Sequence, residues 1–91
     1  MAIVVTLEVP GMTKEQYDQS VTQFGNGVKH AAGFIAHGSG AIEGGYYVTE
    51  IWESQEDWER WMRENVMPAA GELGIQPSPP TIREAETVLT A

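Results

Sequence analysis

The order in which strand-like and helix-like segments follow one another is the feature that most restricts the fold of this chain. Alternating, β-branched stretches predict strands over residues 2–9, 34–43, 46–53 and 81–90. Apolar side chains at three- and four-residue steps predict two helices, over residues 13–25 and 54–74. The resulting order is βαββαβ, in which two similar βα units repeat.

The boundaries of these segments carry recognisable signals. Thr13 begins a capping box with Gln16, whose side chain is placed to bond back to the Thr13 amide. A Gly-Gly pair at 44–45 predicts a two-residue hairpin turn between the second and third strands. Pro68 predicts a kink or a separate short helix, and Gly74 ends the second helical pattern, as glycines also end the first.

Right-handed crossover connections place both helices on the same face of a sheet built in this order. The sequence therefore predicts an α+β, ferredoxin-like fold, with a four-stranded antiparallel sheet and two helices on one face. The opposite face keeps apolar side chains, and an exposed apolar sheet of that size is an association surface. We expect a second copy of the chain to cover it, which forms a dimeric α+β barrel with a pocket inside each half.

Length and composition are consistent with this expectation. The 91 residues form a single domain, 1–91, and a chain this short buries only a thin core. It has no cysteine and only two histidines, so neither disulfides nor a cluster of histidine ligands within one chain can support the fold. Self-association remains as the source of additional stability.

The charge balance excludes several classes of partner. The chain has 13 acidic and 5 basic residues, a formal net charge of −8, and no cluster of Lys and Arg. Such a field repels nucleic-acid phosphates and anionic lipid surfaces. The apolar start lacks a basic leader segment, and no stretch approaches the ~20 apolar residues of a membrane span. We expect a cytoplasmic protein that binds neither nucleic acid nor membrane.

The sequence resembles a known superfamily over nearly its whole length. A Trp-Glu-Ser at 52–54 ends the third predicted strand and is followed by EDWERWMRENVMPA at 56–69. Together with the βαββαβ order, these residues are similar to the dimeric α+β barrel superfamily, and most similar to its antibiotic-biosynthesis-monooxygenase-like (ABM) branch. The resemblance implies a homodimer that binds a hydrophobic small molecule. Members of the superfamily include cofactor-independent quinone-forming monooxygenases, haem-degrading enzymes and muconolactone-isomerase-like proteins.

Two departures from the patterns of the superfamily bear on function. The haem-degrading branch uses an axial His with Asn and Trp partners, and no such set aligns here. The monooxygenases that oxidise aromatic polyketides bring several polar residues into the pocket, and this chain offers few.

Strand parity selects the candidate pocket residues. One face of the third strand carries Tyr46, Val48, Glu50 and Trp52. Burying Glu50 beneath packed helices is costly unless it is paired, so we expect this face to line a partly wet barrel interior, away from the helices. In the second strand the same reasoning leaves the Phe/Ala/Gly face to the helices. The cavity side is then Ile35, His37, Ser39 and Ala41.

His37 and Glu50 are the candidate catalytic pair. An imidazole, which titrates near neutral pH, suits a general base that takes a proton from a phenol or an acidic carbon. Glu50 would orient this histidine or bind a ligand hydroxyl. With the turn at 44–45, the direct partner of Glu50 is residue 39, which leaves His37 diagonal but within reach. The alternatives are a structural histidine bonded across the barrel and a strand-end carboxylate paired with Arg83.

The remaining candidates would contact the substrate. Stacking of the aromatic members on a flat molecule is one interpretation, and ordinary filling of the barrel is the other. Trp58, Trp61 and Met62 lie at helical spacing and are expected in the core or at a subunit contact. The predicted substrate-binding set is Tyr46, Trp52, Val48, Ser39 and Thr6.

These residues support hypotheses from different classes. The first is a cofactor-independent monooxygenase of secondary metabolism, in which His37 takes a proton, Glu50 orients it and the substrate carbanion reacts with oxygen. The second is a non-catalytic ligand-binding or accessory dimer, which the small set of polar residues favours. A third is haem binding through His37 or His30, although His30 is better explained as a solvated loop residue. We expect no bound cofactor and no metal.

Overall fold

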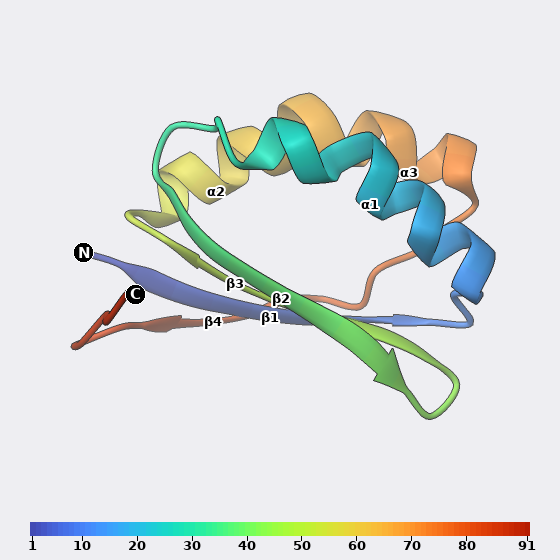
Figure 1. Cartoon of the computed structure of the whole chain (residues 1–91), viewed down its shortest axis with the longest axis horizontal. Helices are drawn as coiled ribbons and strands as arrows, with labels where there is room; N and C mark the ends of the chain where they lie inside the picture. The colour runs from blue at the N-terminus through green and yellow to red at the C-terminus, as the bar shows by residue number, and fades with distance from the viewer.

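In the computed structural model, which describes residues 1–91, the helices lie together on one face of a twisted sheet (Figure 1). The sheet has four strands in the order β2-β3-β1-β4. Their bounds are Ile3–Pro10 for β1, Phe34–Ile42 for β2, Gly45–Trp52 for β3 and Thr81–Glu84 for β4. Every neighbouring pair is antiparallel, so the predicted ferredoxin-like α+β fold is confirmed.

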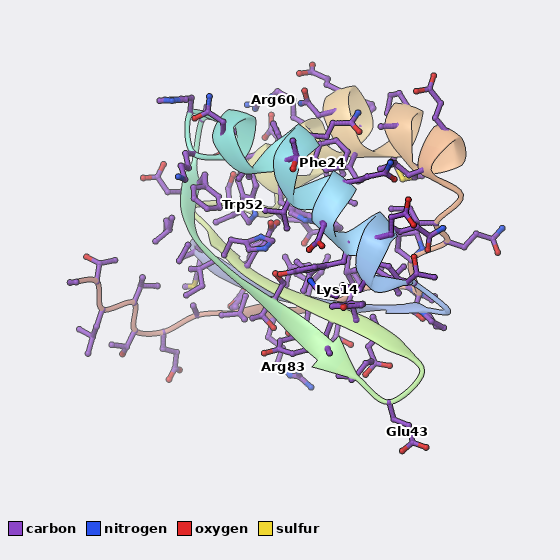
Figure 2. The ribbon with its side chains drawn as sticks, turned by 45° about the vertical axis from the view of Figure 1, so that its right-hand side comes forward. Lys14, Phe24, Glu43, Trp52, Arg60 and Arg83 are labelled. Carbon is purple, nitrogen blue, oxygen red and sulfur yellow. The ribbon has the colours of Figure 1, made fainter.

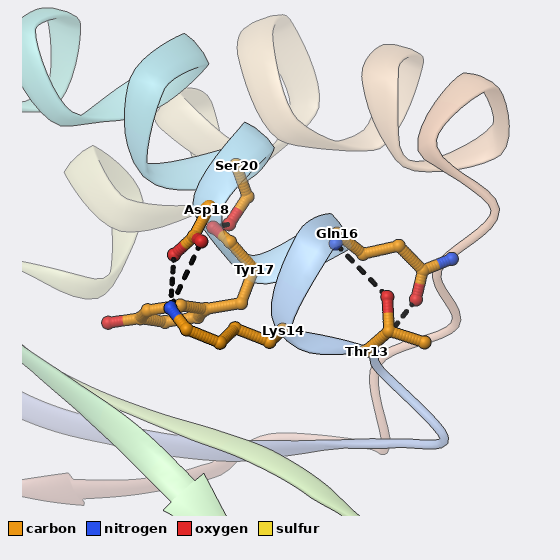
Figure 3. A network of polar contacts seen from close by, with 6 residues as sticks. All are labelled: Thr13, Lys14, Gln16, Tyr17, Asp18 and Ser20. Atoms are coloured by element: carbon orange, nitrogen blue, oxygen red, sulfur yellow. Dashed lines mark hydrogen bonds and ion pairs between the residues drawn. The ribbon is translucent and has the colours of Figure 1, made fainter.

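Helix α1, Lys14–Val28, begins with the predicted capping box. The Gln16 amide donates to Thr13 Oγ1 at 3.1 Å, and the Thr13 amide donates to Gln16 Oε1 at 3.0 Å (Figure 3). These bonds satisfy N–H groups that no helical carbonyl can reach, so the first turn is held in place by its own side chains.

The glycines within α1 do not end it, contrary to prediction. Gly25 and Gly27 have no positive φ, and the helix continues to Val28. A methyl group on Gly27 would lie 3.4 Å from the ring of Trp61. That is an ordinary contact distance, so the space beside Trp61 does not by itself require glycine at this position.

The second helical segment is continuous but irregular in its middle. It comprises α2, Gln55–Trp61, a π-helical turn, Met62–Val66, and α3, Met67–Leu73. The predicted irregularity is present, but it lies in the turn before Pro68. This proline has no N–H to donate back along the helix, and the preceding amide, that of Met67, reaches five residues back to the Met62 carbonyl. Gly74 ends α3 with a φ of +73°, as predicted.

Strand β4 is shorter than predicted. It covers Thr81–Glu84, and residues 85–90 do not extend it. Glu84 lies opposite Ile3, the first residue of β1, and the Ala85 amide still donates to the Ala2 carbonyl at 2.8 Å. Beyond that bond the neighbouring strand offers no partner, so the ladder stops.

The hairpin between β2 and β3 turns one residue earlier than predicted. Ile42 pairs with Gly45, which leaves two loop residues, of which Gly44 has a φ of +78°. Figure 2 shows the other loop residue, Glu43, at the exposed tip of the hairpin. The shift moves every pair between the two strands by two residues, and His37 becomes the direct partner of Glu50.

The hydrophobic core lies between the sheet and the helices. Trp52 is fully buried there (Figure 2), and around it pack Ile3, Val5, Val28 and Trp58. The side chains of Glu50 and Trp52 therefore lie on the helix-covered face, and the prediction that they point away from the helices is wrong. That prediction assumed that a glutamate beneath the helices has no partner, and the structure supplies partners.

A shift in the pairing of β2 turns the His37 side chain toward the helices as well. Phe34 pairs with Trp52 and Ala36 pairs with Ile51, which leaves Ile35 as an extra residue. Phe34 and His37 both face the helices as a result. An uninterrupted strand would point them to opposite faces.

Candidate functional site

A cavity of about 760 Å³ lies between the sheet and the helices. Of its 24 lining residues, 16 are hydrophobic, and they come from both layers. The sheet contributes Val5, Leu7 and Val48, and the helices contribute Phe24, Trp61 and Met62. This volume is typical of small-molecule sites. The cavity lies beneath the helices, whereas the sequence analysis placed it on the open face of the sheet.

His37 and Glu50 form the polar centre of this cavity. They face each other from β2 and β3, and His37 Nδ1 lies 2.6 Å from Glu50 Oε2. The Glu50 side chain is 10% exposed, whereas that of His37 is 35% exposed. The pair therefore consists of a buried carboxylate and an imidazole that reaches the open side of the cavity.

Trp52 supplies the second partner of Glu50. Its Nε1–H donates to Glu50 Oε1 at 3.0 Å, so each carboxylate oxygen has one hydrogen-bond partner. A buried carboxylate is costly without partners, and these two bonds offset the loss of water. Arg83, the alternative partner considered from the sequence, lies on β4 opposite Val4 and forms no ion pair.

The polar contacts continue from His37 toward α1. His37 Nε2 lies 3.1 Å from Ser39 Oγ, and Ser39 Oγ lies 2.7 Å from the hydroxyl of Tyr17. The Tyr17 ring stacks on Tyr46, with centroids 4.3 Å apart and an interplanar angle of 10°. One continuous series of hydrogen bonds, which we call the polar network, therefore joins Trp52, Glu50, His37, Ser39 and Tyr17.

When His37 is neutral, the Glu50 carboxylate fixes the direction of the hydrogen bonds from His37 to Tyr17. A carboxylate only accepts, so His37 Nδ1 carries the proton that is donated to Glu50. In the neutral imidazole Nε2 is then an acceptor, and Ser39 must donate its single O–H to it. Ser39 can therefore only accept from Tyr17, and the phenol donates to Ser39.

Four of the residues singled out in the sequence line the cavity, namely His37, Glu50, Ser39 and Val48. Trp52 does not line it, because it is fully buried and reaches the site only through its bond to Glu50. Tyr46 contacts the ring of Tyr17 but does not line the cavity.

Thr6, another predicted substrate contact, does not line the cavity. Its neighbours Val5 and Leu7 line the cavity. Because side chains alternate along a strand, Thr6 lies on the open face of the sheet. Thr6 therefore does not line this cavity, and its contact with a substrate stays a prediction.

Tyr17 is the site residue that the sequence analysis did not identify. Together with Val21 and Phe24, at i, i+4 and i+7, it belongs to the apolar stripe of α1, and all three line the cavity. The signal for a functional role is the hydroxyl. A tyrosine on a buried helix face usually finds a hydrogen-bond partner there, and the sequence does not show which one.

Few charged groups surround the cavity. Lys29 is its one lining lysine or arginine and forms no ion pair. Lys14 lies near Tyr17 at the exposed start of α1, where the hydrogen bond to Asp18 raises the pKa of Lys14 (Figure 3). No group of three or more His, Asp or Glu side chains is placed to hold a metal ion. None of the helices combines the length and the apolar character needed to cross a bilayer.

Solved structures share this fold at low sequence identity. An oxygenase described as cofactor-independent, SnoaB from Streptomyces nogalater, aligns as a variant with a TM-score of 0.69 at 12% identity, covering 99% of this chain and 97% of that one. The monooxygenase ActVA-Orf6 from Streptomyces coelicolor, in complex with nanaomycin D, aligns with a TM-score of 0.60 at 15% identity, covering 99% and 90%. The heme-degrader MhuD from Mycobacterium tuberculosis, with two hemes in its active site, aligns with a TM-score of 0.54 at 20% identity, covering 100% and 99%. At these identities the likeness establishes the fold alone.

Comparison of the sequence with protein families gives one match. The antibiotic biosynthesis monooxygenase (ABM) family model covers residues 1–72. No curated protein matches the sequence at a significant level. Because the family model spans most of the chain, the chain belongs to the antibiotic biosynthesis monooxygenase family.

Proposed function

We propose that this chain is a cytoplasmic, homodimeric, cofactor-independent oxygenase that acts on a flat hydrophobic molecule with an acidic C–H or O–H group. The observation that carries the proposal is the His37–Glu50 pair, hydrogen-bonded at 2.6 Å within a mostly apolar cavity of about 760 Å³. Membership of the ABM family and the likeness to two oxygenases support it.

His37 is the base of the proposed reaction. Glu50 accepts the Nδ1 proton, holds the ring in one orientation and stabilises the imidazolium that forms when Nε2 gains a proton. Removal of the proton leaves its bonding electrons on the substrate as an enolate, which then reacts with O₂. For a CH₂ group between two aromatic rings, the balanced outcome is CH₂ plus O₂ giving C=O plus H₂O, with O₂ as the oxidant.

The surroundings of the pair favour an aromatic substrate of low charge. Polar side chains are concentrated where β2 and β3 face Tyr17, and Phe24, Trp61 and Met62 form part of the apolar wall. A flat molecule places its oxygen-bearing edge against the polar network and its rings against this wall. The net charge of −8 and a single lining lysine give the site little attraction for polyanions.

Oxygen uptake with anthrone as the probe tests this proposal. We expect the wild-type protein to consume oxygen and to form anthraquinone, which chromatography identifies. Replacing His37 with Ala is expected to lower kcat by about 100-fold or more, because a general base typically contributes that much to the rate.

Tyr47→Phe is a control for the His37→Ala variant. Tyr47 lies opposite Gly40 on the open face of the same hairpin, away from the cavity. We expect it to keep wild-type turnover. A folded His37→Ala protein with an unchanged rate would refute the base role. A wild-type protein that consumes no oxygen with anthrone or with a naphthohydroquinone would refute the oxygenase proposal.

A ligand-binding role without turnover is the second candidate, and one observation favours it. No buried side-chain nitrogen or oxygen lacks a hydrogen-bond partner, so none of these atoms depends on a substrate for its first hydrogen bond. Native mass spectrometry of the purified protein distinguishes the two candidates. A retained small molecule in a protein that shows no oxygen uptake would support binding alone.

The residues around the cavity do not suit haem. Both ring nitrogens of His37 already have hydrogen-bond partners, so an axial bond from Nε2 to iron would displace Ser39. The two propionates of haem would find one lysine, Lys29, on the cavity wall. His30, the other histidine considered from the sequence, does not line the cavity. No step of the proposed reaction involves haem.

A second copy of the chain is proposed to cover the open face of the sheet. Figure 1 shows that the helices leave this face uncovered. Only 11 of the 91 residues are buried, and the single chain exposes 5864 Å². A compact monomer of this mass exposes about 5,200 Å², so the excess is roughly 600 Å². That excess approaches one partner's share of a standard interface, roughly 800 Å².

We expect sedimentation equilibrium to give twice the chain mass of 10.0 kDa. Ile51 lies on the open face between Val4 and Ala36, so Ile51→Lys places a charge in the proposed interface. Desolvating an unpaired ammonium is expected to raise the dimer Kd by about tenfold or more. A wild-type protein that stays a folded monomer at all concentrations contradicts the dimer.

A further inference from the structure

Direct proton transfer to His37 would use its Nε2 atom, which already has a hydrogen-bond partner in the polar network. Ser39 donates to His37 Nε2 at 3.1 Å, so the lone pair that would take a substrate proton is already in use. Glu50 occupies the other ring nitrogen at 2.6 Å. A substrate in the cavity therefore meets an imidazole with no free nitrogen.

Tyr17 presents a free acceptor to the cavity instead. Its hydroxyl makes one hydrogen bond, at 2.7 Å to Ser39, and it donates in that bond. The phenolic oxygen therefore keeps a lone pair that no donor occupies, and Tyr17 lines the cavity. The stacked ring of Tyr46 restricts how far the Tyr17 ring can move.

We propose that Tyr17 and Ser39 relay the substrate proton to His37, an inference that rests on the proton abstraction proposed above. The substrate C–H or O–H bond breaks, and its electrons stay on the substrate. Its proton goes to the Tyr17 oxygen, the Tyr17 proton goes to Ser39 Oγ, and the Ser39 proton goes to His37 Nε2. The result is an imidazolium paired with Glu50, while Tyr17 and Ser39 are neutral again. The relay needs no co-reactant.

The existing hydrogen bonds already point in the direction that this relay requires. When His37 is neutral, as a base must be, Glu50 holds its proton on Nδ1, and both hydroxyl groups then donate toward His37 before any substrate binds. Donors that are oriented in advance cost no reorganisation at the moment of reaction, and the new positive charge forms beside the buried carboxylate. Direct transfer to Nε2 would first require the Ser39 hydroxyl to rotate away.

Exchange of the anthrone CH₂ protons with D₂O under nitrogen measures proton abstraction separately from oxygenation. We expect the wild-type protein to accelerate this exchange, and Ser39→Ala and Tyr17→Phe to slow it by about tenfold or more each. Ser39→Thr restores a hydroxyl and is expected to recover most of the rate. Ser78→Ala and Tyr47→Phe remove hydroxyls from residues that do not line the cavity and are expected to leave the rate unchanged.

The Ser39→Ala variant separates the relay from direct transfer. Loss of the hydroxyl frees His37 Nε2, so direct transfer predicts an unchanged or faster exchange, and that result would overturn the relay. Exchange by the wild-type protein without oxygen uptake in air, slowed in both variants, would refute the oxygenase and support the relay. Absence of exchange in the wild-type protein would refute both.

A solvent isotope experiment distinguishes a relay from a structural role of Ser39. We expect wild-type turnover to curve when it is plotted against the fraction of D₂O, because two solvent-exchangeable protons, those of the Tyr17 and Ser39 hydroxyls, move in one step. A straight line would show that at most one solvent-exchangeable proton moves in that step, and it would overturn the relay. Ser39→Thr keeps a hydroxyl at this position, so the relay predicts a curved plot for this variant as well. The test can therefore be made even if Ser39→Ala folds poorly.

Discussion

Replacing Glu50 with Gln is expected to lower kcat by about 10³- to 10⁴-fold while leaving the fold intact. Gln has the shape of Glu, but its amide has one acceptor end and one donor end. Trp52 Nε1–H needs an acceptor at 3.0 Å, so the amide oxygen faces Trp52 and the NH₂ group faces His37 Nδ1. His37 must then accept at Nδ1 and carry its proton on Nε2, where it cannot act as a base.

Nitrogen-15 NMR of His37 checks this expectation directly. In the Glu50→Gln protein we expect the ring proton to move from Nδ1 to Nε2, which also forces Ser39 to accept from His37 and to donate to Tyr17. Glu50→Asp is the matched control, because it keeps a carboxylate with a shorter reach. It is expected to retain the wild-type tautomer and to lose about tenfold in kcat. An unchanged proton position or wild-type turnover in Glu50→Gln would contradict the role assigned to Glu50.

Most of the fold follows from sequence signals that involve only a few neighbouring residues. The capping box at Thr13, the αL cap at Gly74 and the periodicity of each segment agree with one another, and such local agreement is what makes a fold readable. The errors arise where a boundary depends on a distant partner. The strand that begins at Thr81 stops at Glu84, which pairs with Ile3, the first residue of β1, and residues 85–90 carry no sign of this boundary.

The members of the proposed catalytic pair are easier to predict than their position. Polar residues within otherwise apolar strands are conspicuous, so His37 and Glu50 stand out in the sequence. Their direct pairing depends on a turn that lies one residue earlier than the glycine pair suggests. The orientation of His37 toward the same face as Phe34 depends on the extra residue Ile35 in β2, because a single inserted residue reverses every side chain that follows it.

The prediction that Glu50 points away from the helices is wrong, although the sequence contains the residue that explains its position. Trp52 follows two residues later on the same face of the same strand, and its indole N–H is a donor that a buried carboxylate can use. Tyr17 is different, because its contact with Ser39 joins α1 to β2 and requires the tertiary packing. Within the site, neighbours along one strand are therefore predictable from sequence, and contacts between helix and sheet are not.

Replacing Trp52 with Ala is expected to remove most of the free energy of unfolding at 25 °C. Trp52 is fully buried, packs edge-on against Phe34 at 5.5 Å and lies 6.5 Å from Trp61. Removing a buried Trp typically lowers the free energy of unfolding by about 3–5 kcal/mol. Leaving Glu50 without its indole donor lowers it by a further ~1–3 kcal/mol. Small domains have only about 5–15 kcal/mol in total, so little stability would remain.

Trp52→Phe separates packing from the hydrogen bond to Glu50, because it keeps an aromatic ring and removes the N–H. We expect the free energy of unfolding to fall by about 1–3 kcal/mol in urea titrations followed by far-UV circular dichroism. The loss should shrink when Glu50 is already Gln, since a neutral amide is cheaper to leave unpaired than a carboxylate. A coupling energy of at least ~0.5 kcal/mol between the two substitutions is therefore expected. Strict additivity would mean that the indole N–H does not hold the carboxylate, and the argument that places the proton on His37 Nε2 in the Glu50→Gln protein would lose its basis.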